Sequence, residues 1–142
     1  MATLAQILAN FETGDTLTQS ALQEMINNCY SGLQAPQTIT YSATPTFNYE
    51  LGVNAVITLT GDITTLTMQN VPDGGTGSIK IIQDGTGSAF GINAFAHTGL
   101  TFKYLGGISP IGTEINGEAN GETEVIYKRI GSVINISFGL FN

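Results

Sequence analysis

The chain has 142 residues, of which only 11% are charged, and a formal net charge of -7 at pH 7. This is the length of one ordinary domain, and its acidic balance repels phosphate backbones and anionic lipids, so we expect neither nucleic acid binding nor membrane insertion. Cys29 is the only cysteine, which excludes an internal disulfide and a cysteine-based zinc cluster.

The first ten residues have no basic flank, and no run of about 18 apolar residues occurs anywhere, so we expect neither a signal peptide nor a transmembrane helix. Apolar residues recur at helical spacing from Leu17 to Tyr30. Thr18 is the predicted N-cap of this helix, Gly32 suits its C-terminal cap, and Pro36 prevents its continuation. Residues 1–35 are therefore predicted to form a helical docking segment.

The apolar stripe of this helix has two interpretations. It docks on another protein of an assembly, or it packs on the β domain of its own chain. Burying each such side chain yields roughly 1.5 to 3 kcal/mol in either case. The predicted partner-docking residues are Leu17, Leu22, Met25 and Ile26.

Beyond Pro36 the apolar period changes from about 3.6 to 2, which predicts β-strands. We expect about eight, over residues 47–53, 55–60, 63–70, 78–83, 89–95, 100–105, 122–130 and 133–141. Gly61-Asp62 and Gly131-Ser132 have the composition of type II′ turns, which predicts two antiparallel hairpins. The predicted fold class is therefore mostly β: an antiparallel, jelly-roll-like β-sandwich over residues 36–142.

Few residues suit catalysis or metal binding. His97 is the only histidine, so a histidine-based metal cluster is excluded, and no G-x-S-x-G context supports a Ser-His-Asp arrangement. We interpret His97 as structural. The chain is predicted not to be an enzyme and to need no cofactor.

Four glutamates gather near a glycine-rich stretch: Glu114, Glu118, Glu122 and Glu124. We interpret them as a solvated acidic loop, because no EF-hand pattern accompanies them. The alternatives are a calcium site made by Glu118, Glu122 and Glu124, and a carboxylate pair of the kind that hydrolyses glycosides.

The tetrapeptide Gly-Thr-Gly-Ser occurs twice, at residues 75–78 and 85–88. Each copy precedes a predicted strand instead of a helix, so we interpret both as turns and not as phosphate-binding loops.

A sugar-binding platform is disfavoured, because the chain has no Trp and five aromatic residues fall on predicted inward faces: Phe47, Tyr49, Phe102, Tyr104 and Phe138. Tyr41 is the aromatic residue best placed to be free.

Two segments resemble structural proteins of tailed bacteriophages. Residues 11–20, Phe-Glu-Thr-Gly-Asp-Thr-Leu-Thr-Gln-Ser, lead into the predicted helix as the opening of many phage fibre and appendage proteins does. Residues 61–87, which end in Gln-Asp-Gly-Thr-Gly, are similar to a β domain in structural proteins of Bacteroidetes-infecting, crAss-like phages.

This resemblance implies a virion structural protein: a head fibre, a capsid decoration protein or a tail-appendage component. It implies a homotrimer that docks on other virion proteins, such as capsid or portal and tail components, and that is assembled into the virion in the host cytoplasm. The alternative is a small carbohydrate-binding β-sandwich module that contacts glycans of the host surface.

Overall fold

The computed structural model describes residues 19–20, 22, 35–105 and 115–141. The chain divides into two compact units, Met1–Gln34 and Ala35–Asn142. In the first unit the described residues are Gln19, Ser20 and Leu22, which are helical and exposed. Both predicted ends of the N-terminal helix lie outside the described residues. No helix in the described part of the chain is long and apolar enough to cross a membrane.

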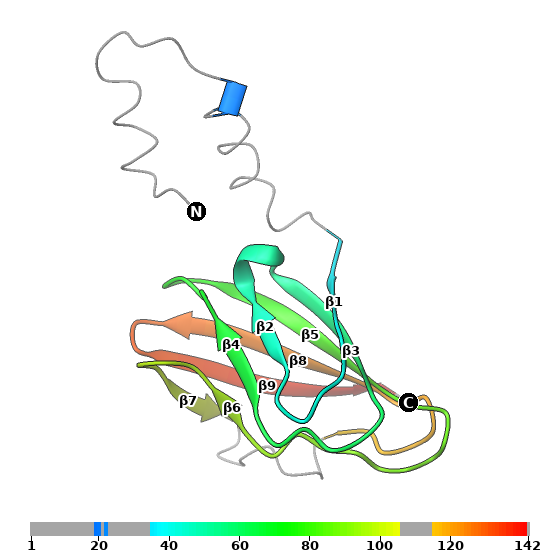
Figure 1. Cartoon of the computed structure of the whole chain (residues 1–142). Helices are drawn as coiled ribbons and strands as arrows, with labels where there is room; N and C mark the ends of the chain where they lie inside the picture. The colour runs from blue at the N-terminus through cyan, green and yellow to red at the C-terminus, as the bar shows by residue number, and fades with distance from the viewer. Residues whose placement is uncertain (1–18, 21, 23–34, 106–114, 142) are drawn as a thin grey trace, which may run out of the picture. The chain divides into compact units, whose positions relative to one another are not determined.

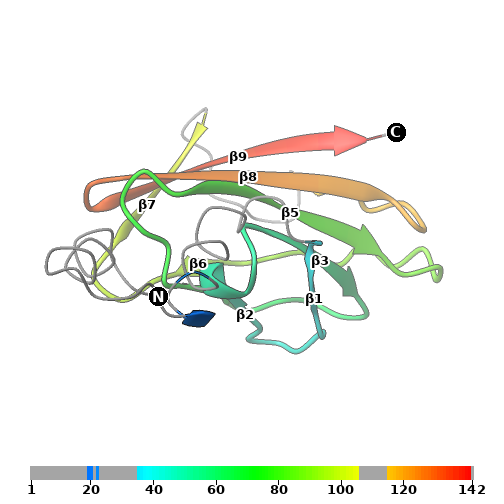
Figure 2. The same cartoon turned by 90° about the horizontal axis from the view of Figure 1, so that it is seen from above.

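The second unit is mostly β, as predicted. Its described residues form a short 3-10 helix, η2 (Tyr49–Leu51), and nine strands: β1 (Gln37–Ile39), β2 (Thr46–Asn48), β3 (Asn54–Leu59), β4 (Leu66–Gln69), β5 (Thr76–Gln83), β6 (Phe95–Ala96), β7 (Thr101–Tyr104), β8 (Glu122–Ile130) and β9 (Val133–Phe141). One sheet has the order β1-β3-β5-β8-β9-β7, and the other has the order β2-β4-β6 (Figure 1). Seen from above, β8 and β9 lie in one layer and β2 and β6 in the other (Figure 2).

The first six strands alternate between the two sheets, and each strand from β3 to β6 pairs in parallel with the strand two places earlier in the chain. The paired residues are separated by about 18 to 29 positions in sequence. This is the connectivity of a β-helix, in which each turn of the chain stacks on the one before it. The three turns are β1-β2, β3-β4 and β5-β6. The antiparallel pair β8-β9 then extends the larger sheet beside β5.

The prediction of an antiparallel sheet is therefore wrong for most strand pairs. Pairing is antiparallel only in β5-β8 and β8-β9 among the described residues, and β7 pairs with β9 in parallel. The hairpin expected at Gly61-Asp62 is also wrong, because β3 and β4 belong to different sheets. The Asp62 carboxylate instead accepts a hydrogen bond from the Gly91 amide at 2.9 Å, so this segment links two turns of the β-helix.

The hairpin expected at Gly131-Ser132 is confirmed. Strands β8 and β9 cover the predicted ranges, 122–130 and 133–141. Gly131 adopts a φ of +58°, as the first central residue of a type II′ turn requires. Its amide donates to the Asp73 carboxylate at 2.7 Å, which ties the turn to the loop before β5.

Two predicted strands are much shorter than expected. The strand expected over residues 47–53 ends at Asn48, whose side chain accepts a hydrogen bond from the Glu50 amide at 3.1 Å and caps η2. The strand expected over residues 89–95 reduces to β6 and an isolated parallel bridge between Ile63 and Ile92.

The core lies between the two sheets and is mainly aliphatic. Tyr127 is its largest fully buried side chain. The ring meets Phe47 edge-on at 5.4 Å between centroids, and the hydroxyl donates to the Val53 carbonyl at 2.6 Å. A methyl group on Gly77 would overlap both the Val53 carbonyl oxygen and the Tyr127 hydroxyl. Gly77 lies within β5, so the turn interpretation of the first Gly-Thr-Gly-Ser copy is wrong here: close packing requires this glycine.

The second copy does form a turn. The Asp84 carboxylate accepts from the Thr86 amide at 3.0 Å, and Gly87 has a φ of +76°. Just before this turn, the buried Gln83 side chain donates to the Phe90 carbonyl at 2.7 Å and accepts from the Phe90 amide at 3.2 Å. These two bonds hold the returning segment against the end of β5.

Candidate functional site

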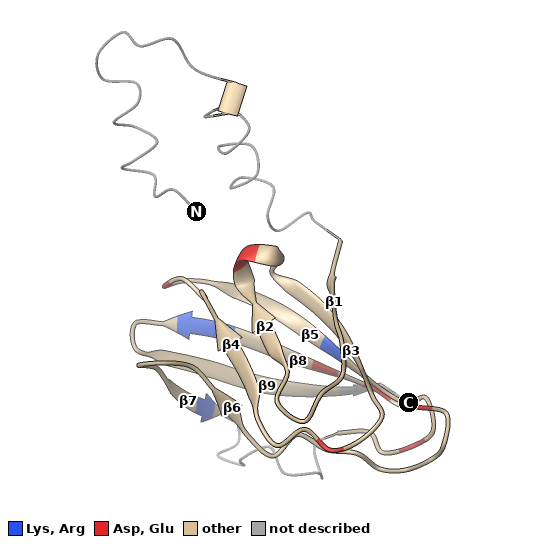
Figure 3. Cartoon of the chain, in the orientation of Figure 1, with Lys and Arg blue, Asp and Glu red and all other residues tan. Residues whose placement is uncertain are grey.

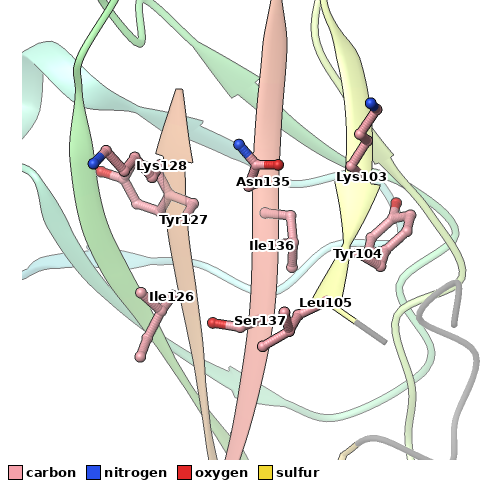
Figure 4. Close-up of a pocket in the computed structure, with 9 residues that line it drawn as sticks. All are labelled: Lys103, Tyr104, Leu105, Ile126, Tyr127, Lys128, Asn135, Ile136 and Ser137. Carbon is pink, nitrogen blue, oxygen red and sulfur yellow. The ribbon is translucent and has the colours of Figure 1, made fainter. Parts of the chain in front are cut away.

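The larger sheet has an outer face that carries the best candidate for a functional surface. We define the outer face as the side of β5, β7, β8 and β9 that points away from the core. At its centre β9 presents Asn135 and Ser137. Ile126 and Lys128 of β8 lie on one side of β9, and Lys103 and Leu105 lie on the other (Figure 4). These side chains surround a hollow of about 380 Å³.

Aliphatic side chains are exposed on this face. Leu105 is 82% exposed, Ile126 47% and Ile130 59%. Single exposed apolar residues are ordinary, but several on one face with polar residues around them are typical of a protein contact surface. The signal in the sequence was the segment 122–130, where apolar residues occupy both faces of the strand: Val125 and Tyr127 inside, and Ile126 and Ile130 outside. Sequence reasoning missed this surface because it predicted a strand over residues 122–130 without assigning its residues to the two faces.

The four positively charged side chains differ in whether they have a partner within the chain. All four Lys and Arg residues lie in the described part of the chain. Lys80 pairs with Glu122 at 2.7 Å, and Arg129 donates to the carbonyls of Val71 and Gly131. Lys103 and Lys128 have no ion pair with any described residue. They flank Asn135 across β9, which makes this end of the outer face basic, as the blue ends of β7 and β8 show in Figure 3.

The other end of β8 is acidic. Glu122 and Glu124 point outward near its start, and Glu124 has no ion pair within the described residues. Glu118 lies in an exposed turn. The described residues contain no group of three His, Cys, Asp or Glu side chains placed to hold a metal ion, so the calcium alternative at Glu118, Glu122 and Glu124 gains no support. Glu114 lies outside the described residues.

His97 follows β6 and is half-buried. Its Nδ1 lies 2.8 Å from the carbonyl oxygen of the adjacent Thr98, and its Nε2 is buried with no hydrogen-bond partner among the described residues. No described carboxylate or hydroxyl hydrogen-bonds to the ring, so the described residues do not form the hydrogen bonds of a catalytic triad around it.

The aromatic residues do not form an exposed platform in the described part of the chain, where the large exposed apolar side chains are all aliphatic. Tyr41 is half-buried over Gly61, and its hydroxyl donates to the Asp62 carbonyl at 3.3 Å, so the prediction that Tyr41 is free is wrong. Burial raises the pKa of the phenols of Tyr104 and Tyr127, so both are neutral at pH 7. Tyr127 lies within the core, and Tyr104 is partly buried against it.

Only Leu22 of the four predicted docking residues is described, and it is 38% exposed. Leu17, Met25 and Ile26 lie outside the described residues. The docking role of this stripe remains a prediction.

Comparison of the chain with protein-family models, with curated proteins and with solved structures finds no match.

Proposed function

We propose that this chain is a non-enzymatic structural protein of a tailed-phage virion: a head fibre, a capsid decoration protein or a tail-appendage component. It acts by association with further copies of itself and by docking on other virion proteins. The residues of segments 11–20 and 61–87 give the proposal its phage context. Three copies around an axis are the arrangement that this resemblance implies.

The observation that carries the proposal is the outer face. Leu105, Ile126 and Ile130 leave aliphatic surface in water on one side of a rigid sheet, and covering such surface is favourable. The low proportion of charged residues works in the same direction, because uncharged polar groups lose little desolvation energy when a partner covers them. Stacked turns of parallel strands also suit this role, since they form a stiff body with an extended side.

Mass spectrometry of purified particles from the phage that encodes the chain tests the proposal. The chain should be present at a fixed ratio to the capsid protein. A particle that assembles completely and infects normally without the chain among its proteins would contradict the proposal.

A pair of variants tests the docking segment. Leu22→Asp combined with Met25→Asp places two charges on the predicted apolar stripe and should prevent incorporation into particles. Leu51→Asp is the matched control, because Leu51 is also an exposed leucine but lies on η2 of the other unit. Circular dichroism of each purified variant must match that of the wild type. Normal incorporation of the double variant would exclude docking through this stripe.

A further inference from the structure

We infer that two copies of this chain pair through their outer faces, with the strands of one sheet running antiparallel to those of the other. The inference deepens the proposed function, and it rests on that function only because both require self-association. The partner that covers the outer face is a second copy of the chain, as the order of charges along β8 indicates.

The middle of the outward row of β8 is complementary to itself. From the start of the strand they are Glu122, Glu124, Ile126, Lys128 and Ile130. Ile126 is the midpoint between an acid two residues before it and a base two residues after it. A two-fold axis that crosses the strands at Ile126 reverses this order in the second copy. Each Lys128 then faces Glu124 of the other copy, and the two Ile126 side chains meet. Ile130 faces Glu122, whose carboxylate already pairs with Lys80 of its own copy.

Lys128 and Glu124 of the same copy cannot form an ion pair with each other. Residues four apart in a strand are separated by about 13 Å, too far for an ion pair. Lys128 and Glu124 both lack an ion-pair partner among the described residues. Two sheets packed face to face lie about 10 Å apart, a distance that outward side chains from both sheets together span.

The neighbouring strands fit the same arrangement. Ser78 of β5 and Ser137 of β9 lie beside Ile126 in the paired register, and both are small enough to let the larger side chain make the contact. Leu105 follows the end of β7 and lies beyond Ser137 in the same row, so the axis also brings the two Leu105 side chains together. In this register Lys80 lies opposite the uncharged Thr76 of the second copy. The axis therefore places no two described side chains of like charge opposite each other.

Charge exchange tests the inference directly. Glu124→Lys and Lys128→Glu should each weaken self-association of the full chain by at least tenfold, because the two-fold axis makes every substitution act twice. The double variant Glu124→Lys with Lys128→Glu restores both pairs in reversed order and should recover most of the lost affinity. Sedimentation equilibrium over a wide concentration range gives the dissociation constants, and circular dichroism shows whether each variant is folded.

Two further variants complete the design. Glu118→Lys changes the net charge as Glu124→Lys does, but in an exposed turn before β8 and outside the paired strands, so it should leave association unchanged. Ile126→Thr keeps a β-branched residue suited to a strand and removes apolar contact at the axis, so it should weaken pairing without unfolding the chain. Added salt should weaken the wild-type association, because exposed ion pairs are screened.

The wild-type mass distinguishes failure of this inference from failure of the proposed function. A mass of two copies supports the pairing. A mass of six copies also supports it, because a threefold axis combined with the two-fold axis gives a hexamer. A strict monomer overturns it, and so does a trimer whose mass is indifferent to the charge exchanges. Presence of such a trimer in purified particles would leave the proposed function intact.

Discussion

Replacement of Gly77 by alanine should destabilise the β unit far more than an ordinary glycine-to-alanine change in a strand. The added methyl group would overlap the Val53 carbonyl oxygen, which is backbone, and the hydroxyl of Tyr127. Overpacking of this kind costs about 1 to 3 kcal/mol. Displacement of the phenol breaks its 2.6 Å hydrogen bond to Val53 and leaves a buried acceptor unpaired, at about 1 to 3 kcal/mol. We therefore expect a loss of about 2 to 6 kcal/mol.

Gly139 provides the matched control, because it also lies in a strand and an added methyl group there would meet only the Glu124 carbonyl, at 3.9 Å. Gly139→Ala should leave stability unchanged or raise it by up to about 1 kcal/mol, since alanine restricts the unfolded chain more than glycine does. Urea unfolding followed by circular dichroism measures both free energies. At about 4 °C per kcal/mol for a unit of this size, Gly77→Ala should lower the melting temperature by about 8 to 24 °C. If both variants melt together, the close packing at Gly77 does not constrain the fold.

Three other results are expected from the core. Tyr127→Phe should lower the free energy of unfolding by about 1 to 3 kcal/mol, because the Val53 carbonyl loses its donor; an unchanged urea midpoint would contradict this. Burial raises the pKa of the phenols of Tyr104 and Tyr127 in the folded state, so the stability linked to their neutral forms is complete below the ordinary tyrosine pKa of about 10 and is lost as the pH rises above it. Just above that pH, the phenolate absorbance of the folded chain should therefore be lower than that of the chain unfolded in urea, and equal absorbance would contradict this. Gln83→Leu should cost about 1 to 3 kcal/mol, because the Phe90 carbonyl loses its donor and the Phe90 amide keeps only the Ser88 carbonyl as an acceptor. A melting temperature equal to that of the wild type would refute this role.

The sequence predicted the hairpin β8-β9 to the residue because every signal for it is local. Alternation sets the two strands, and Gly131 marks the turn between them. The β-helix could not be predicted in the same way. A period of two is the same for parallel and antiparallel strands, and Gly61-Asp62 does not indicate which sheet the following strand joins. The turns also differ in length, from about 18 to 29 residues, so the sequence shows no regular repeat.

The candidate surface was missed for a related reason. Ile126 stands between the inward residues Val125 and Tyr127, and Ile130 ends the strand. A short run of mixed apolar residues does not show which of them a sheet leaves exposed. Tyr41 was misassigned because its contact with Gly61 joins segments about 20 residues apart, and alternation carries no information on such packing.

The stacked turns also determine the order in which the chain gains structure. The hairpin β8-β9 is closed by a two-residue turn and can form within microseconds, whereas its pairing with β5 joins residues about 40 to 50 positions apart. Pairing between residues so far apart in sequence slows folding, because the entropy of closing the loop is lost before the stabilising contacts form. The turn β1-β2 pairs only with β3 and β4 among the described strands. Amide hydrogens there should exchange first, so the β unit opens from its N-terminal turn while the hairpin stays protected.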